Sequence, residues 1–128
     1  MGWRYEFVEQ SWADVREFEA SVWSGKAAGQ YLLAIIDSVL ASGRAGDLAV
    51  ITSMHDLVIV NRPVPDPPMD VLIVRAPGSL EPPEDGCVRI DYVAVSGRNT
   101  TLERPSAEAV ALFWRFVEEK FGITPVVR

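Results

Sequence analysis

The sequence predicts an α+β fold in which three helices cover, mainly on one face, an antiparallel sheet of five to six strands. Short runs rich in Val and Ile fill the middle of the chain, where loops rich in proline and glycine separate them. Two segments with apolar residues at helical spacing precede these runs, and a third follows them. The expected element order is therefore β-α-α-β-β-β-β-(β)-α, in a single domain that spans residues 1–128.

The first strand is expected at the start of the chain, where every second residue is aromatic. Trp3, Tyr5 and Phe7 alternate with the charged residues Arg4 and Glu6. A period of two is typical of a strand with one buried face.

The first two helices are expected at residues 12–24 and 28–41. Ser11 is a suitable N-cap for the first, and Asp14 three residues on completes a start that resembles a capping box. The second has an apolar stripe so wide that we expect burial on more than one side. The main positions of that stripe are Leu32, Ile35, Ile36, Val39 and Leu40.

The hairpin over residues 48–60 is expected to be the element around which the chain packs. Two β-branched runs flank a short polar turn at residues 53–56. Both runs are nearly continuous, which indicates that part of the hairpin is covered on both faces. Further strands are expected at residues 71–74 and 87–95, with a short last strand at residues 100–103.

The last helix opens at Pro105-Ser106 and ends at Gly122. It carries the cleanest amphipathic pattern of the chain, which predicts that one side of the helix packs on the sheet. The positions on that side are Val110, Phe113, Trp114, Val117 and Phe121.

Composition and charge limit the classes of partner. The net charge of −6 argues against nucleic acid and against anionic membrane surfaces, and it is compatible with a basic protein partner. The longest apolar stretch, near residues 31–36, is too short to span a bilayer. No signal peptide is visible at the start, and the single cysteine, Cys87, allows no internal disulfide. We therefore expect a cytoplasmic protein.

The residues that carry chemistry give no catalytic set. His55 is the only histidine, and its short spacing from Ser53 and Asp56 cannot easily align a triad, so His55 and Asp56 are interpreted as turn residues. Cys87 is interpreted as an ordinary, partly buried residue. One histidine and one cysteine cannot form a zinc site, and no phosphate-binding or calcium-binding motif occurs. We expect no metal and no cofactor.

Two arginines give the most suggestive pattern. If Arg75 and Arg89 project from neighbouring strands, they could clamp a carboxylate or a phosphate. The alternative is that each pairs with a nearby acid such as Asp70, Asp91 or Glu103. The candidate ligand-binding residues are Arg75, Arg89, His55 and Trp114.

Three functional hypotheses follow. The first is a non-catalytic protein-interaction domain that forms a homodimer, because no proline guards the edge of the strand at residues 88–95. One version of it is an inhibitor or immunity-type partner of a basic protein. The second is a small-molecule-binding domain with an apolar cavity between the sheet and the last helix. The third is an enzyme that uses His55 with Asp56 or Asp91.

Overall fold

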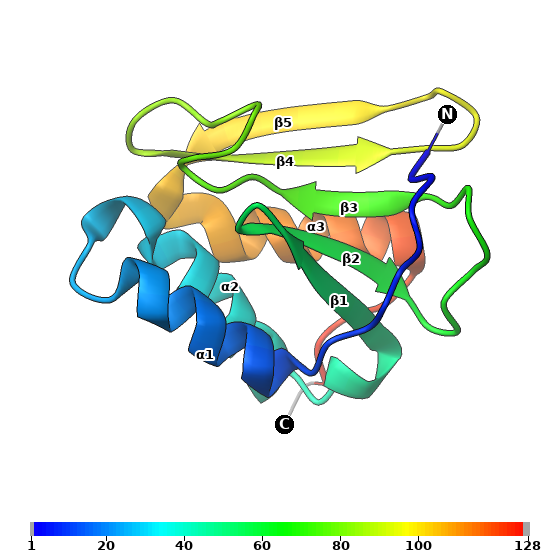
Figure 1. The fold of residues 1–128 in the computed structure, drawn as a ribbon, viewed down its shortest axis with the longest axis horizontal. Helices are drawn as coiled ribbons and strands as arrows, with labels where there is room; N and C mark the ends of the chain where they lie inside the picture. Colours follow the sequence, from blue (N-terminus) through cyan, green and yellow to red (C-terminus); the bar gives the residue numbers. More distant parts are fainter. Residues whose placement is uncertain (1, 127–128) are drawn as a thin grey trace.

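Five antiparallel strands form one sheet whose spatial order follows the chain, β1-β2-β3-β4-β5 (Figure 1). The computed structural model describes residues 2–126. The strands are β1 (Leu48–Ser53), β2 (Asp56–Asn61), β3 (Val71–Val74), β4 (Cys87–Val93) and β5 (Thr100–Pro105). With three helices beside this sheet, the predicted α+β class is confirmed.

The three α-helices lie close to their predicted positions, at α1 (Trp12–Trp23), α2 (Gln30–Ala41) and α3 (Ala109–Phe121). The Ser11 Oγ accepts a hydrogen bond from the Asp14 N–H at 3.0 Å, which caps α1 as expected. Gly122 ends α3 in the left-handed conformation, with a φ of 69°. Short 3-10 turns occur at η1 (Ala27–Gly29), η2 (Ala45–Asp47) and η3 (Ser106–Glu108). Within residues 2–126, no helix has the length and apolar character needed to cross a membrane.

The expected first strand is wrong. Residues 3–7 make only an isolated bridge to the sheet, in which Trp3 and Met69 exchange backbone hydrogen bonds of 2.8 and 3.0 Å. The chain bends at Tyr5, whose side chain is 71% exposed, while Trp3 and Phe7 pack inward. The three aromatic residues therefore do not share one face. Instead of joining the sheet, this N-terminal segment crosses in front of β3, β2 and β1 (Figure 1).

The predicted hairpin forms, but it is not the centre of the sheet. β1 is an edge strand, and β3 occupies the middle of the sheet. The apolar run of β2, residues 57–60, is fully buried because it is covered on both faces, as its continuous pattern indicated. β4 pairs with both β3 and β5, so the strand edge that we expected to be unguarded is an interior position.

Side chains alternate between two faces of the sheet, and the two faces bury separate apolar clusters. On the helix face, the strands pack against all three helices through Leu48, Val50, Leu57, Ile59, Leu72, Val74, Val88 and Ile90. On the opposite face, called here the outer face, Trp3 and Phe7 pack over a smaller cluster. That cluster comprises Ala49, Val58, Val60, Met69, Val71 and Ile73.

The buried side of α3 differs in part from the predicted stripe. Its most buried residues are Ala109, Leu112, Phe113, Phe116 and Val117, whereas Val110, Trp114 and Phe121 are only partly buried. α3 packs against α2 as well as the sheet, so its buried arc is wider and rotated relative to the single stripe. The Trp114 Nε1–H accordingly donates a hydrogen bond to the Ser38 Oγ of α2 at 3.1 Å.

Candidate functional site

The register of the sheet gathers charged residues at one end of the outer face. Arg89 of β4 pairs with Glu103 of β5, and the Arg75 N–H, just beyond β3, donates to the Arg89 carbonyl at 3.0 Å. Asp91 lies one step further along the same face of β4, because alternate residues of a strand share a face. Asp56 enters from the start of β2. Four strands thus bring their polar side chains to one place.

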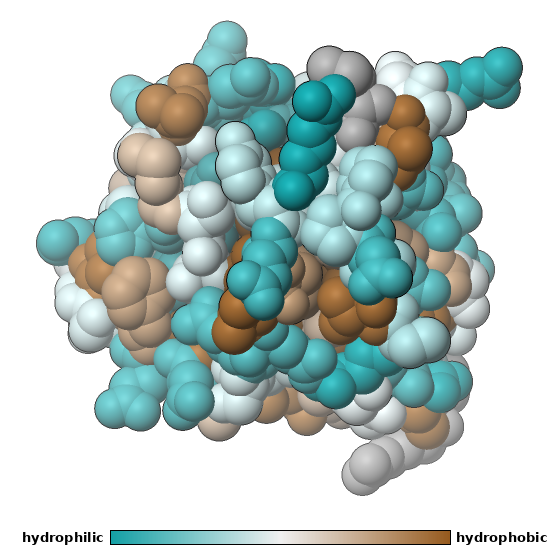
Figure 2. All heavy atoms as spheres, turned by 45° about the vertical axis from the view of Figure 1, so that its right-hand side comes forward, coloured by the Kyte–Doolittle hydropathy of each residue, from teal (hydrophilic) through white to brown (hydrophobic). Residues whose placement is uncertain are grey.

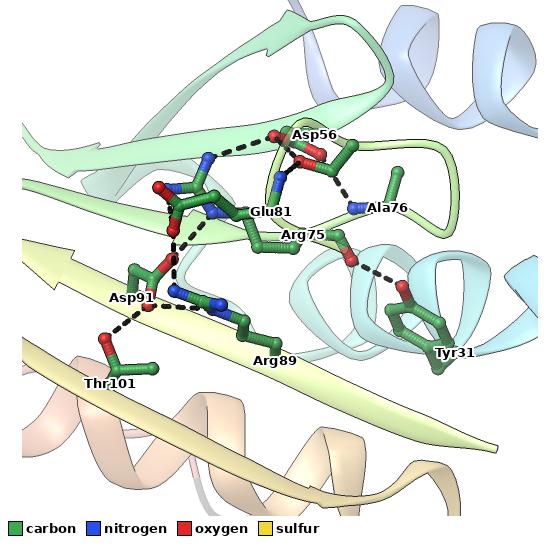
Figure 3. Close-up of polar contacts among 9 residues, drawn as sticks. Tyr31, Asp56, Arg75, Ala76, Glu81, Arg89, Asp91 and Thr101 are labelled. Atoms are coloured by element: carbon green, nitrogen blue, oxygen red, sulfur yellow. Dashed lines mark hydrogen bonds and ion pairs between the residues drawn. The ribbon is translucent and has the colours of Figure 1, made fainter. Parts of the chain in front are cut away.

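Arg75 is the centre of an ion-pair network (Figure 3). Its Nε lies 2.7 Å from the Asp91 Oδ2, and its Nη1 lies 3.3 Å from the Asp56 Oδ2. The Arg89 Nε lies 3.3 Å from the Asp91 Oδ1, and the Arg89 Nη2 lies 2.6 Å from the Glu81 Oε2. We call these five residues, Asp56, Arg75, Glu81, Arg89 and Asp91, the charged network.

Both aspartates of the network are buried and have further hydrogen-bond donors. The side chains of Asp56 and Asp91 are 8% and 5% exposed. The Asp56 carboxylate accepts hydrogen bonds from the Ala76 N–H at 2.7 Å and the Ser79 hydroxyl at 2.8 Å. The Thr101 hydroxyl donates to Asp91 at 2.6 Å. Buried carboxylates need such partners to offset their lost hydration, so these bonds fix the network in place.

The arginine at the centre keeps its charge. Burial lowers the pKa of the Arg75 guanidinium, but the hydrogen bonds and charges of Asp91 and Asp56 outweigh burial and raise the pKa above its ordinary value. The Tyr31 hydroxyl of α2 also donates to the Arg75 carbonyl, which ties the network to the helices (Figure 3).

The sequence prediction for Arg75 and Arg89 described two arrangements, and the structure combines elements of both. The arginines project from neighbouring positions onto one face, as a clamp requires. Their donors, however, point to internal carboxylates. Asp91 was among the expected partners, whereas Asp56 and Glu81 were not. Asp56 escaped attention because it was interpreted as a turn residue, although an acid that directly precedes a fully buried β-run must find a buried partner.

His55 lies at the hairpin tip and does not join the charged network. Met54 and His55 have positive φ angles of 51° and 72°, which are uncommon for residues other than glycine. The imidazole stacks on Phe18 of α1 with ring centroids 5.3 Å apart, and it meets the edge of Trp23. Its Nδ1 is buried without a hydrogen-bond partner among the described residues.

Trp114 lies on the other side of the sheet, between α3 and α2. Of the four candidate ligand-binding residues, the structure therefore brings together only Arg75 and Arg89.

A groove of about 510 Å³ opens beside the network, between the N-terminal segment, the hairpin tip and the loop over residues 76–86. Asp56 and Arg75 are its deeper lining residues. Three large apolar side chains lie at its rim: Tyr5, Met54 and Leu80 are 71%, 62% and 82% exposed. Sequence reasoning missed this rim, because its members come from three distant segments. The oblique view in Figure 2 shows apolar groups emerging within a mainly hydrophilic surface.

A buried carboxyl lies behind the hairpin tip. Glu19 of α1 is fully buried, and its Oε2 accepts a hydrogen bond from the Trp23 Nε1–H at 2.9 Å. Its Oε1 has no partner among residues 2–126. Burial, reinforced by the charge of Asp56 and only partly offset by the Trp23 bond, raises the pKa of Glu19 to about 7.

The polar groups of this arrangement are engaged mainly in contacts within the protein. The carboxylates of Asp56 and Asp91 bind arginine, backbone and hydroxyl donors, and His55 makes aromatic contacts. In the described part of the chain, no three His, Cys, Asp or Glu residues form a group that could hold a metal ion. The site therefore consists of the fixed charged network beside the exposed apolar rim of the groove.

Comparison with known proteins provides no family for this chain. No protein-family model matches it, and neither a curated protein nor a solved structure matches it.

Proposed function

We propose that this protein is a non-catalytic binding module of the inhibitor or immunity type, and that a basic protein partner docks on its outer face. The observation that carries the proposal is the apolar rim of the groove. Tyr5, Met54 and Leu80 expose most of their side chains although they lie around one hollow. Exposed apolar groups gathered at one place mark interaction sites, and aromatic anchors are typical of binding hot spots.

Charge supports a basic partner. The chain has a net charge of −6, and the loop beside the groove exposes Glu81, Glu84 and Asp85 next to Leu80. An acidic surface accelerates encounter with a basic protein and disfavours acidic competitors. Exposed carboxylates around an apolar anchor also resemble the polar rim and apolar centre of known interfaces.

Site-specific photo-crosslinking tests the docking surface directly. A photoreactive residue at position 80 should capture a partner in cells, whereas the same residue at Ala111, which is exposed on α3, should not capture it. The captured protein is then purified, and its affinity is measured for the wild type and for Tyr5→Ala/Leu80→Ala.

We expect the groove variant to lose at least about tenfold in affinity, as truncation of hot-spot residues does. A matched variant on α3, Glu118→Gln/Glu119→Gln, should bind like the wild type, because both carboxylates lie on the opposite side of the sheet. Capture at position 111 alone, or unchanged affinity of the groove variant, would contradict the proposal.

We also propose that the protein self-associates. The edge available for pairing is that of β5, because β4 lies inside the sheet. The Ser106 N–H donates a hydrogen bond to the Gly86 carbonyl, just before β4. Backbone N–H groups along an antiparallel strand point alternately toward and away from the neighbouring strand. The N–H groups of Thr101 and Glu103, which are odd-numbered, therefore point away from β4. No described strand pairs with that edge. At the other edge, Gln10 closes β1 with bonds to Val50 and Thr52.

Light scattering over a concentration series tests the dimer. We expect twice the chain mass of 14.1 kDa, and Glu103→Pro should restore the monomer because it removes an outward N–H outside the charged network. A monomer mass for the wild type at high micromolar concentration would contradict self-association.

A small-molecule ligand is the second candidate function. The expected cavity between the sheet and the last helix has no support in the packing, because Phe113, Leu72 and Ile90 are fully buried there. The groove, in contrast, has a volume in the range of ligand sites. A screen for compounds that raise the melting temperature, with Tyr5→Ala as the control, distinguishes this candidate from protein docking.

A further inference from the structure

We infer that Glu81 is the charged contact of the docking surface, and that the groove receives a cationic side chain flanked by an apolar one. This inference rests on the proposed function and adds the chemistry of the segment that binds. It depends on how Glu81 is held, on the charge left over in the network and on the position of Leu80.

Glu81 is fixed in position and yet remains open to solvent. The Arg89 Nη2 lies 2.6 Å from its Oε2, and the Arg75 Nη2 lies 4.0 Å from the same oxygen. The Glu81 side chain is nevertheless 55% exposed. Its partners are themselves held by the two buried aspartates. A carboxylate that is already oriented loses little conformational entropy on binding, which favours affinity.

The charged network has a net charge of −1, because it contains one more carboxylate than arginine. Its two arginines face three carboxylates, and Asp56 and Asp91 already offset the arginines from the buried side. Glu81 supplies the surplus at the surface. A cation that approaches Glu81 therefore meets a net attraction, although the nearby guanidinium groups reduce it.

Leu80 places an apolar anchor directly beside this charge. The Ser79 hydroxyl donates to Asp56 at 2.8 Å and accepts from the Glu81 N–H at 3.3 Å, so both ends of Leu80 are fixed. Pro77, Pro82 and Pro83 further restrict the loop. Leu80 and Tyr5 line the same groove. The surface thus offers an apolar slot and a carboxylate side by side.

A carboxylate ligand is the competing occupant, because it could displace Glu81 and pair with the two arginines. The geometry favours the cation. Displacement of Glu81 by a ligand carboxylate would break the 2.6 Å contact between Glu81 and Arg89. The ligand would replace one ion pair with another and would still lie near the negative charges of Asp56 and Asp91. A cation, in contrast, adds an ion pair with Glu81 and breaks none of the existing ion pairs.

An NMR titration of the ¹⁵N-labelled protein at constant ionic strength tests the inference with three capped dipeptide amides: acetyl-Leu-Arg, acetyl-Leu-Gln and acetyl-Leu-Glu. We expect the arginine peptide to shift the amide signals of Tyr5, Met54, Leu80 and Glu81. It should bind at least about threefold more tightly than the glutamine peptide, with a Kd in the millimolar range that suits so small a ligand.

Glu81→Gln should remove the preference for arginine, whereas Glu118→Gln, which removes an equal charge from α3, should retain it. A preference for the glutamate peptide, an arginine preference that survives Glu81→Gln, or no preference at all would overturn the inference. If the three peptides bind the groove equally, or do not bind, while crosslinking at position 80 still captures the partner, the docking surface stands and only its cationic specificity falls. Failure of that crosslinking removes the proposed function itself.

Discussion

The two faces of the sheet use the same alternating strands for different purposes. On the helix face, the strands present mainly apolar side chains, which pack against three helices. On the outer face, the same strands bury a smaller apolar cluster at one end and the charged network at the other. The helix face therefore accounts for most of the hydrophobic burial, whereas the outer face holds the buried ion pairs of the charged network beside an open groove.

This difference indicates where the protein can be altered without being unfolded. A residue of the helix face contributes through buried area and close packing. A residue at the rim of the groove is exposed and contributes little to folding. The charged network lies between these cases, because its aspartates are buried but its Glu81 is not.

Truncation on the helix face should have the largest effect. Phe113 of α3 is fully buried against the sheet. Phe113→Ala should lower the free energy of unfolding by about 3–5 kcal/mol, as large aromatic deletions in cores do. Urea denaturation measures this loss. A loss below about 1 kcal/mol would show that the helix face is not the main source of stability.

Removal of the central arginine should rank second. Arg75→Met removes the cation beside Asp56 and leaves Asp91 with Arg89 alone, and an uncompensated buried charge costs about 3 kcal/mol. The control Arg115→Met removes an exposed arginine of α3 that pairs with the exposed Glu119, so it should change stability by less than about 0.5 kcal/mol. Equal losses in the two variants would mean that the network is not stabilising.

The buried Glu19 should make stability depend on pH. Its pKa is raised from an ordinary value of 4.5 to about 7, so the folded protein keeps a proton that the unfolded chain has lost between these values. Stability should therefore fall as pH rises from about 5 to 8, by an amount on the order of 2–3 kcal/mol. Denaturation at several pH values measures the slope.

Glu19→Gln provides the matched comparison, because it keeps the shape of the side chain and cannot ionise. The stability difference between the wild type and this variant should change with pH in the window between about 5 and 8, and it should be constant on either side. Parallel pH profiles of the two proteins would show that Glu19 does not titrate in this range.

The smallest effect on folding is expected at the groove rim. Tyr5→Ala and Leu80→Ala should each alter the free energy of unfolding by less than about 0.5 kcal/mol, because both side chains are largely exposed. A melting temperature far below that of the wild type for either variant would place these residues in the folded core. It would also remove the argument for an interaction surface.

The sequence predicted the parts of this picture that depend on local pattern. The β-branched runs located β1 to β4, and the spacing of apolar residues located all three helices. Along β4, Arg89 and Asp91 lie on the face opposite Val88 and Ile90, as the period of two in a strand requires.

What the sequence did not predict depends on contacts between distant segments. The alternating aromatics indicated a strand, but a bend at Tyr5 directs it outward and leaves Trp3 and Phe7 against the sheet. The groove rim joins residues near positions 5, 54 and 80, which no local pattern relates. Asp56 looked like a turn residue because its partners lie about twenty positions further along the chain.

Hydrogen exchange of the protein with and without its captured partner tests most directly whether the outer face is the docking surface. We predict that binding protects the amides near Tyr5, at the hairpin tip and at Leu80–Glu81, and leaves those of α2 and α3 unchanged. Protection confined to α2 and α3, with the groove residues exchanging as in the free protein, would contradict the account.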